Sequence, residues 1–275
     1  MKVGLCLEMV LTNRPIEERL KTAARLGYEY VEIWWVDSIF KGPADQLAKL
    51  AEANGVTITN TVINSPDGSV GSALTDPRKS KEAWLRRARM TIDYTREAQI
   101  PNTIFLTGNR VPDLQDQQML ESVIEWTKPV VDLAEKAGVT LLLEALNDKY
   151  DHPGYWLTSS DLGGEICRRI GSSRLRLLFD CYHMQVMEGD LVNHIKRNID
   201  VIGHFHAAGV PGRHEVFQGE TNYPFVLAQI EQLGYQGVFG LEFTPSMEDE
   251  ASLAQTLAYM SNAALKGHAP PKNRA

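Results

Sequence analysis

Residues 134–144, AEKAGVTLLLE, carry the pattern that decides the fold of this chain. Helix-forming residues end at Gly138, and glycine is the residue that most often stops a helix before a strand. The apolar run VTLLL then predicts a strand buried on both faces, as in a parallel sheet. Glu144 follows this run directly. The stretch therefore predicts a helix-to-strand junction with an ionisable residue at the carboxyl end of the strand.

The same alternation of strand and helix continues along the whole chain. Amphipathic helical segments separate the strands, and Gly27, Gly55 and Gly234 precede strands as Gly138 does. Eight strands are predicted, at residues 3–7, 30–34, 56–62, 103–107, 139–143, 174–180, 201–206 and 238–242. Eight such units predict an α/β fold, a single-domain (β/α)8 barrel, or TIM barrel, over residues 1–266.

The remaining residues, 267–275, are polar and proline-rich and are predicted to form a flexible tail. An open doubly wound sheet is the alternative fold for the rest of the chain. That fold usually carries a GxGxxG motif after its first strand, and this chain has none there.

Composition limits the partners that we expect. The chain has 275 residues and a net charge of −7 at pH 7. Nucleic acids and anionic membranes need a basic surface, so we expect a small-molecule substrate instead. The three cysteines show no CxxC spacing, and the N-terminus does not resemble a signal peptide. A reduced, cytoplasmic setting is the simplest prediction.

Four ionisable residues close four consecutive predicted strands: Glu144, Asp180, His206 and Glu242. Their spacings of 36, 26 and 36 residues each approximate one strand–helix repeat. A single acid at a strand end is commonly a helix cap or a solvated loop residue. Three buried carboxylates that converge repel one another, however, and a divalent cation removes that cost. The four residues therefore predict a metal site at the carboxyl-terminal face of the barrel.

The donor set indicates which ions suit this site. Three carboxylates and one imidazole favour Mn²⁺, Mg²⁺ or Co²⁺, and zinc remains compatible with them. Open positions on such an ion can accept two oxygens of an α-hydroxycarbonyl substrate and acidify its C–H bond. His204 shares a strand face with His206. It is expected either to pack inside the barrel or to orient a ligand.

Five stretches resemble the xylose-isomerase-like TIM-barrel superfamily and, within it, the hydroxypyruvate isomerase family. They are LLLEALN (141–147), FDCYHMQ (179–185), GHFHAAGVPGRHE (203–215), GETNYPFVL (219–227) and GYQGVFGLEFTP (234–245). The resemblance implies interconversion of hydroxypyruvate and 2-hydroxy-3-oxopropanoate (tartronate semialdehyde) through a cis-enediolate. Glu144 and Glu242 would serve both as metal ligands and as the acid and base.

The resemblance also implies substrate contacts from Asn147, His183, Arg213 and Glu215. Trp35 is predicted to contact the substrate as well, although the Trp34–Trp35 pair differs from the aliphatic and Phe residues expected of the family. Arg213 either receives a substrate carboxylate through paired N–H donors or forms a salt bridge to Glu215 or Glu220. Trp34 and Trp35 form either a wall that stacks on a sugar or part of the core. Barrels of this group often associate, so a homo-oligomer is compatible with the resemblance.

A ketose 3-epimerase, or an isomerase of another small sugar or sugar acid, is the alternative that uses the same metal site. Hydroxypyruvate isomerases often carry Gln at the position of His206, whereas ketose 3-epimerases carry His there. Arg213 favours an acid, because a neutral sugar needs no guanidinium.

Two other classes are less well supported. A multi-zinc DNA endonuclease on this barrel would need histidines on the early strands. The sequence has no histidine before His152. A barrel that only binds would have no reason to keep all four ligand candidates.

Overall fold

Strands and helices alternate along the computed structural model, which describes residues 1–36, 38–64 and 74–266. The strands are β1 (Lys2–Cys6), β2 (Tyr30–Glu32), β3 (Thr57–Ile58), β4 (Asn60–Val62), β5 (Asn102–Phe105), β6 (Thr140–Glu144), β7 (Leu175–Asp180), β8 (Ile202–Ala207) and β9 (Val238–Leu241). The helices are α1 (Ile16–Leu26), α2 (Ala44–Ala53), α3 (Glu82–Glu97), α4 (Asp116–Ala137), α5 (Ser160–Ile170), α6 (Cys181–Met187), α7 (Leu191–Asn198), α8 (Tyr223–Gln232) and α9 (Asp249–Lys266).

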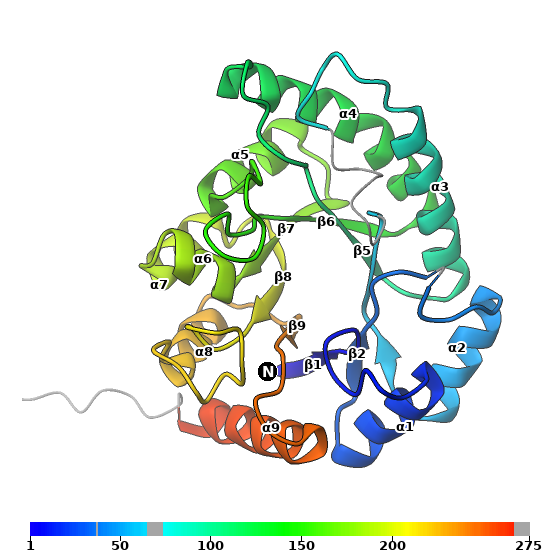
Figure 1. Ribbon diagram of the computed structural model, residues 1–275, viewed down its shortest axis with the longest axis vertical. Helices are drawn as coiled ribbons and strands as arrows, with labels where there is room; N and C mark the ends of the chain where they lie inside the picture. The colour runs from blue at the N-terminus through cyan, green and yellow to red at the C-terminus, as the bar shows by residue number, and fades with distance from the viewer. Residues whose placement is uncertain (37, 65–73, 267–275) are drawn as a thin grey trace, which may run out of the picture.

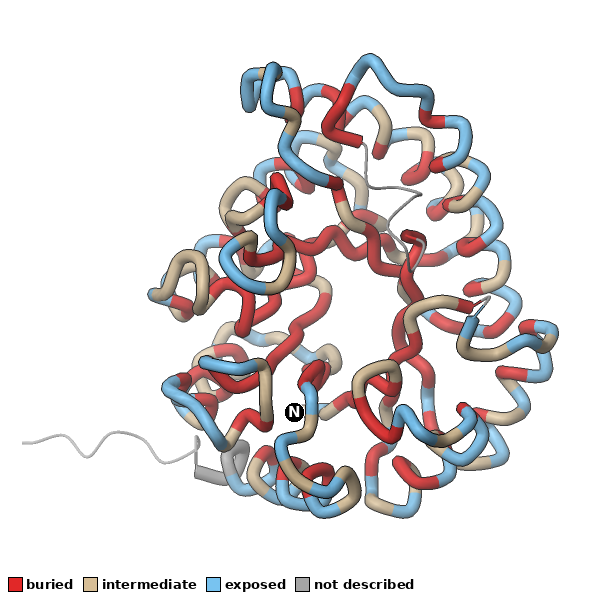
Figure 2. Tube along the Cα trace, in the orientation of Figure 1, coloured by how far each residue is buried: buried red, intermediate tan, exposed pale blue. Residues whose placement is uncertain are grey.

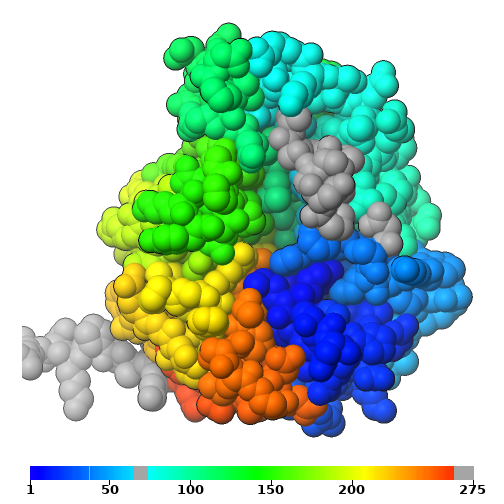
Figure 3. Space-filling model, in the orientation of Figure 1, coloured from blue at the N-terminus to red at the C-terminus, as the bar shows by residue number. Residues whose placement is uncertain are grey.

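The strands form a parallel barrel with the helices outside it, which confirms the predicted (β/α)8 fold (Figure 1). β1 pairs with both β2 and β9, so the first and last strands are neighbours. Figure 3 shows the blue N-terminal segment beside the orange segment that follows β9. Between β2 and β4 the ring closes through two backbone hydrogen bonds. Val62 N–H donates to Trp34 over 2.7 Å, and Ile33 N–H donates to Asn60 over 3.2 Å.

The third predicted strand, 56–62, is wrong as a single strand. β3 pairs with β2, whereas β4 pairs with β5. Thr59 separates them and donates its N–H to Val31 over 2.8 Å. The side chain of Asn60 is buried, with Nδ2 lying 3.0 Å from Nε2 of His204. The chain therefore changes strand partner at the point where a polar side chain enters the barrel.

The helices bury one face against the barrel and leave the other exposed. Figure 2 shows the strands buried around the centre and pale blue surface on the outer turns of the helices. Gly27 and Gly138 end α1 and α4 with φ angles of 98° and 73°, a backbone region that glycine adopts at low cost. The predicted helix stops are therefore observed. Across the described ranges, every helix is too short or too polar to cross a lipid bilayer.

The interior of the barrel has an apolar half and a polar half. Val62, Ile104, Leu142 and Leu178 form an apolar cluster with Trp34 and Trp35 packed against it. The polar half holds the buried side chains of Glu32, Asn60, Glu144, Asp180, His204, His206 and Glu242. Buried ionisable groups are costly unless they are paired or bind a ligand, so the polar half is where a site is expected. The predicted tail, 267–275, lies outside the described residues, and the domain limits stay a prediction.

Candidate metal centre

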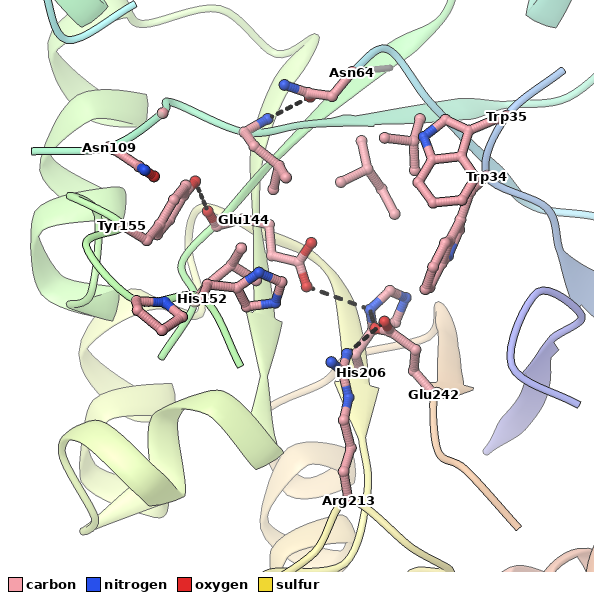
Figure 4. A pocket seen from close by; sticks show the side chains of 16 residues that line it. Trp34, Trp35, Asn64, Asn109, Glu144, His152, Tyr155, His206, Arg213 and Glu242 are labelled. Atoms are coloured by element: carbon pink, nitrogen blue, oxygen red, sulfur yellow. Dashed lines mark hydrogen bonds and ion pairs between the residues drawn. The ribbon is translucent and has the colours of Figure 1, made fainter. Parts of the chain in front are cut away.

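Four side chains predicted as metal ligands meet at the carboxyl-terminal end of the strands. Glu144 ends β6, Asp180 ends β7, His206 lies in β8 and Glu242 follows β9. One candidate ligand atom from each lies within 4.8 Å of the others, and all four side chains are buried. Figure 4 shows Glu144, His206 and Glu242 directed toward one another. The structure therefore brings together the set that the strand ends predicted.

Strand register explains why these residues meet. Asp180 pairs with His206 across β7 and β8, and His206 pairs with Gly240 across β8 and β9. The N–H of Glu242 donates to the carbonyl of Ala207 over 3.0 Å. The backbone alone thus holds three of the four side chains on neighbouring strands.

Asp180 uses one carboxylate oxygen to begin a helix. Oδ1 accepts hydrogen bonds from the backbone N–H groups of Tyr182, at 2.6 Å, and His183, at 3.2 Å, which caps α6. Oδ2 takes no part in the cap and lies 3.7 Å from Nε2 of His183. The cap fixes the carboxylate while leaving its second oxygen for the cluster.

Burial and mutual repulsion shift the pKa values of the cluster. Burial raises the pKa of Asp180 to about 7, and the charges of Glu242 and Glu144 add to this shift. Burial also raises the pKa of Glu144. For Glu242 burial acts in the same direction, but the charges of Arg213 and His206 outweigh it and lower the pKa. The pKa of His206 lies well above its usual value despite burial, because carboxylates surround the ring.

Two unpartnered atoms indicate that the cluster fits a cation. Among the described residues, Oε1 of Glu144 and Nδ1 of His206 are buried without a hydrogen-bond partner. Nδ1 of His206 lies only 2.7 Å from Oε2 of Glu242 and 3.5 Å from Oε1 of Glu144. A divalent ion satisfies these atoms together and offsets the repulsion between carboxylates. The donors of the cluster, three carboxylates and one imidazole, match the predicted Mn²⁺, Mg²⁺ or Co²⁺, and zinc is also compatible with them.

Glu32, which sequence reasoning missed, fixes the ring of His206. Oε2 of Glu32 lies 2.7 Å from Nε2 of His206, and Oε1 lies 2.9 Å from Nε2 of His204. Burial opposes ionisation of Glu32, but the charges of the two imidazoles and their hydrogen bonds lower its pKa below the usual range. Two roles were expected for His204, packing inside the barrel or orienting a ligand. The structure favours the second, because His204 contacts Glu32, which in turn contacts the candidate ligand His206.

A pocket of about 450 Å³ opens beside the cluster. Its polar wall includes Glu144, His206, Arg213 and Glu242, and its apolar wall includes Trp34, Trp35, Val62, Ile104, Leu106 and Leu146. The rings of Trp34 and Trp35 meet edge to face with centroids 5.1 Å apart (Figure 4). Both tryptophans line the pocket and also pack on the apolar cluster, so they belong to the core as well as to the pocket wall. Stacking on a sugar stays a prediction.

Arg213 lies in the pocket wall and contacts a predicted ligand. Its Nη2 donates to Oε1 of Glu242 over 2.6 Å, and its Nη1 lies 3.7 Å from Asp151. The guanidinium also lies over the ring of Tyr182, 5.4 Å from the centroid. Within the part of the chain that the structure describes, Nε of Arg213 has no hydrogen-bond partner. A salt bridge does form, but its partners are not the expected Glu215 or Glu220.

His183 and Asn147 form a pair beside the cluster. Nδ2 of Asn147 lies 2.7 Å from Nδ1 of His183, and it donates to Asp151 over 2.6 Å. Burial and the charge of Arg213 keep the pKa of His183 well below its usual value, so the ring is neutral and its Nε2 carries the proton. This Nε2 lacks a partner among the residues described. Asn147 therefore positions His183, and the direct substrate contact predicted for Asn147 stays a prediction.

Glu215 is not among the residues that line the pocket, and its predicted substrate contact stays a prediction. Its oxygens accept hydrogen bonds from Ser246 Oγ, at 2.8 Å, and Ser252 Oγ, at 2.6 Å. The chain turns at Gly212 and Arg213, both of which have positive φ angles. This turn sends Arg213 into the pocket and Glu215 toward the start of α9.

Other pocket residues escaped sequence reasoning because single residues of their kind are common in loops. His152 lines the pocket, and the neighbouring Asp151 accepts from Tyr182 over 2.8 Å. Both follow β6, the strand that ends at Glu144. Their position after a ligand-bearing strand was the available signal.

Comparisons with known proteins agree with this geometry. Residues 20–263 match the model of the family described as xylose isomerase-like TIM barrel. The chain is 31% identical over 257 residues to 2-oxo-tetronate isomerase of Cupriavidus necator, covering 92% of this chain and 96% of that protein. It is 29% identical over 245 residues to the Danio rerio protein named "Putative hydroxypyruvate isomerase", covering 86% and 87%.

Solved structures share the fold. The AP endonuclease, family 2, from Brucella melitensis superposes with a TM-score of 0.84 at 25% identity, covering 94% of this chain and 99% of that one. An L-ribulose 3-epimerase superposes with a TM-score of 0.82 at 18% identity, covering 98% and 99%. The second similarity concerns the fold alone.

Proposed function

The chain belongs to the xylose isomerase-like TIM barrel family, and from this we propose that it is a divalent-metal-dependent isomerase of hydroxypyruvate, interconverting it with 2-hydroxy-3-oxopropanoate. The isomerase class predicted from the sequence is confirmed by the relatives, which are named as isomerases. Both names describe a 2-oxo acid, which carries a carboxylate beside its ketone. The substrate class therefore depends on whether the pocket can hold a carboxylate.

Arg213 is the observation that carries this proposal. Its guanidinium lies in the pocket wall next to the ligand cluster and keeps N–H groups beyond the one that Glu242 accepts. Such a fork matches a carboxylate. Arg213 also has a φ angle of 57°, a strained conformation for a residue other than glycine. Strain of this kind gathers at functional sites, where the surrounding structure maintains it.

Glu144, Asp180, His206 and Glu242 are the residues that would hold the metal ion. When bound, the ion polarises the substrate carbonyl and acidifies the neighbouring C–H. Mn²⁺, Mg²⁺ and Co²⁺ suit these donors best.

Glu242 and Glu144 are suited to move the proton. Burial raises the pKa of Glu144, whereas the charges of Arg213 and His206 lower that of Glu242, so Glu242 is the better candidate base and Glu144 the better candidate acid. Such opposite shifts identify base and acid in a catalytic pair. Glu242 removes a proton from C3 of the substrate, giving a cis-enediolate, and C2 receives a proton from Glu144. The proton of the C3 hydroxyl passes to the C2 oxygen, which leaves an aldehyde at C3 and a hydroxyl at C2. His183 directs its free Nε2–H toward the same region and can donate to a substrate oxygen.

The size of the pocket supports a slightly longer acid as well. A volume of about 450 Å³ exceeds what a three-carbon acid fills, and one wall is apolar. The apolar wall at Trp34 and Trp35 leaves room for the additional carbon of a four-carbon homologue. Activity on 2-oxo-tetronate, the acid in the name of one relative, is therefore an expected second substrate.

The experiment is to strip the purified protein with a chelator and restore Mn²⁺, Mg²⁺ or Co²⁺ separately. Proton NMR in D₂O then follows hydroxypyruvate, 2-oxo-tetronate and a set of neutral ketoses. Metal-dependent conversion of the acids, with deuterium entering at the exchanging carbon, is the expected result. The proposal would be refuted if the metal-loaded protein converted none of the acids.

A ketose 3-epimerase is the second candidate, and His206 is the observation that favours it, because hydroxypyruvate isomerases often have Gln there. In that case the neutral ketoses would turn over and the acids would not. A small-molecule substrate as the sole partner and a homo-oligomeric state stay predictions.

A further inference from the structure

Glu32 joins two histidines beneath the cluster. It ends β2, it is completely buried, and each of its oxygens faces one imidazole, at 2.7 Å for His206 and 2.9 Å for His204. The two rings stand nearly perpendicular, with centroids 5.0 Å apart. Lysine and arginine are not among the partners of Glu32 in the described structure, so the two imidazoles satisfy its charge.

This contact determines which nitrogen of His206 can bind a cation. In the neutral ring, which is the form that can bind a cation, the contact with Oε2 of Glu32 favours the proton on Nε2 and leaves the lone pair on Nδ1. Nδ1 is the nitrogen that faces Glu242 and Glu144. Without Glu32, the proton could lie on either nitrogen and the ring could turn about χ2.

Close packing holds Glu32 in this one arrangement. A Cβ atom added at Gly240 would lie 2.3 Å from Oε1 of Glu32 and 2.7 Å from Cδ2 of His206. A Cβ at Gly4 would lie 3.4 Å from the same oxygen. Asn60 lies against His204 from another strand. Glycine at position 240 therefore leaves room for the carboxylate and for nothing larger.

We propose that Glu32 is a positioning residue of the metal centre, which holds His206 with Nδ1 toward Glu144 and Glu242, and that His204 anchors Glu32. The inference rests on the metal site of the proposed function. Glu32 touches neither substrate nor cation in this role. It acts through the tautomer and orientation of His206, as carboxylates that support ligand histidines do.

The test measures Co²⁺ binding, because visible absorption reports the geometry around this ion independently of turnover. The full-length protein, Glu32→Gln and His204→Gln are titrated with Co²⁺ by calorimetry and absorption. Gln offers one acceptor oxygen, so it cannot serve both imidazoles. We expect one Co²⁺ per chain in the unmodified protein, a 10- to 100-fold weaker affinity and altered absorption bands in Glu32→Gln, and a smaller loss in His204→Gln.

Glu8→Gln is the matched control. Glu8 is a partly buried glutamate just after β1, but its Oε1 accepts from the backbone N–H of Trp34 over 2.6 Å rather than from a histidine. It should leave the Co²⁺ affinity and bands unchanged. Thermal unfolding without metal, measured for each variant, separates a general loss of stability from a change at the centre.

Three outcomes would overturn the inference. Glu32→Gln with unchanged affinity and bands would remove Glu32 from the centre while the proposed function stands. Two Co²⁺ per chain, with one lost in Glu32→Gln, would make Glu32, His204 and His206 ligands of a second ion. An unmodified protein that binds no Co²⁺, Mn²⁺ or Mg²⁺ would overturn both this inference and the proposed function.

Discussion

Nη2 of Arg213 donates a 2.6 Å hydrogen bond to Oε1 of Glu242, which joins the residue suited to a substrate carboxylate to the residue suited to be the base. The contact lowers the pKa of Glu242, while burial works against it. In the proposed function, the guanidinium would therefore contact both the substrate carboxylate and the catalytic base. Substitutions of Arg213 and of Glu242 should therefore have different effects on KM, which reflects substrate binding, and on kcat, which reflects proton transfer.

Glu242→Gln should lower turnover by about 100-fold or more, the range for loss of a general acid or base. The amide cannot accept the proton from C3, although it keeps nearly the same shape. Thermal unfolding should show an intact fold, and steady-state kinetics with the restored metal ion measures the loss. Turnover close to that of the unmodified enzyme would remove Glu242 from the mechanism.

Arg213→Ala should raise KM for 2-oxo acids by about 10- to 100-fold, since a hydrogen-bonded charge pair contributes about 1.5–3 kcal/mol. Turnover should fall too, because Glu242 loses its hydrogen bond. Arg213→Lys keeps the charge but loses the fork. It should restore part of the turnover while KM for acids stays high.

The measurement compares kcat and KM for an acid and for a neutral ketose in the same preparations. If Arg213→Ala weakens both substrates equally, Arg213 acts only by holding Glu242. In that case the carboxylate assignment is wrong.

The four ligand candidates could be predicted from the sequence because each ends an apolar run that marks a strand. Parallel strands bring their carboxyl ends to one face, so positions along the chain translate into positions around the barrel. Glu144 and Asp180 meet for this reason alone. No long-range contact had to be known beforehand.

Glu32 could not be found in the same way. It precedes Ile33, Trp34 and Trp35, so the apolar run continues past it and gives no sign of a strand end. Its partner His204 lies 172 residues away, and only barrel closure makes them neighbours. The position of the Glu215 side chain could not be predicted for the opposite reason. Glu215 is close to Arg213 in sequence, but a local turn with positive φ angles separates the directions of the two side chains.

Metal affinity should rise with pH through about pH 7 and continue to rise above it. In the absence of a cation, burial and the neighbouring carboxylates raise the pKa of Asp180 to about 7. Below that pH a cation must displace a proton, which weakens binding by about tenfold per pH unit for each proton released. The raised pKa of His206 adds a second proton, which steepens the dependence and extends it above pH 7.

Calorimetry with Mn²⁺ between pH 5.5 and 8.5, in buffers of different ionisation enthalpy, measures both the affinity and the protons released. Release of at least one proton per ion at pH 6 is expected. Affinity that is constant over this range would mean that the cluster is already deprotonated before it binds the ion.

Gly240→Ala adds only one methyl group but should lower both the Co²⁺ affinity and the stability of the protein. The added Cβ would lie 2.3 Å from Oε1 of Glu32 and 2.7 Å from the ring of His206, so one of them must move. Overpacking of this kind costs about 1–3 kcal/mol of the free energy of unfolding. Thermal unfolding and Co²⁺ titration together measure the effect.

Gly4→Ala is the comparison, because its Cβ would meet mainly a methyl group of Val238, at 2.8 Å. It should lower stability while leaving Co²⁺ affinity close to normal, whereas equal losses of affinity in both variants would show that Gly240 has no special relation to the site.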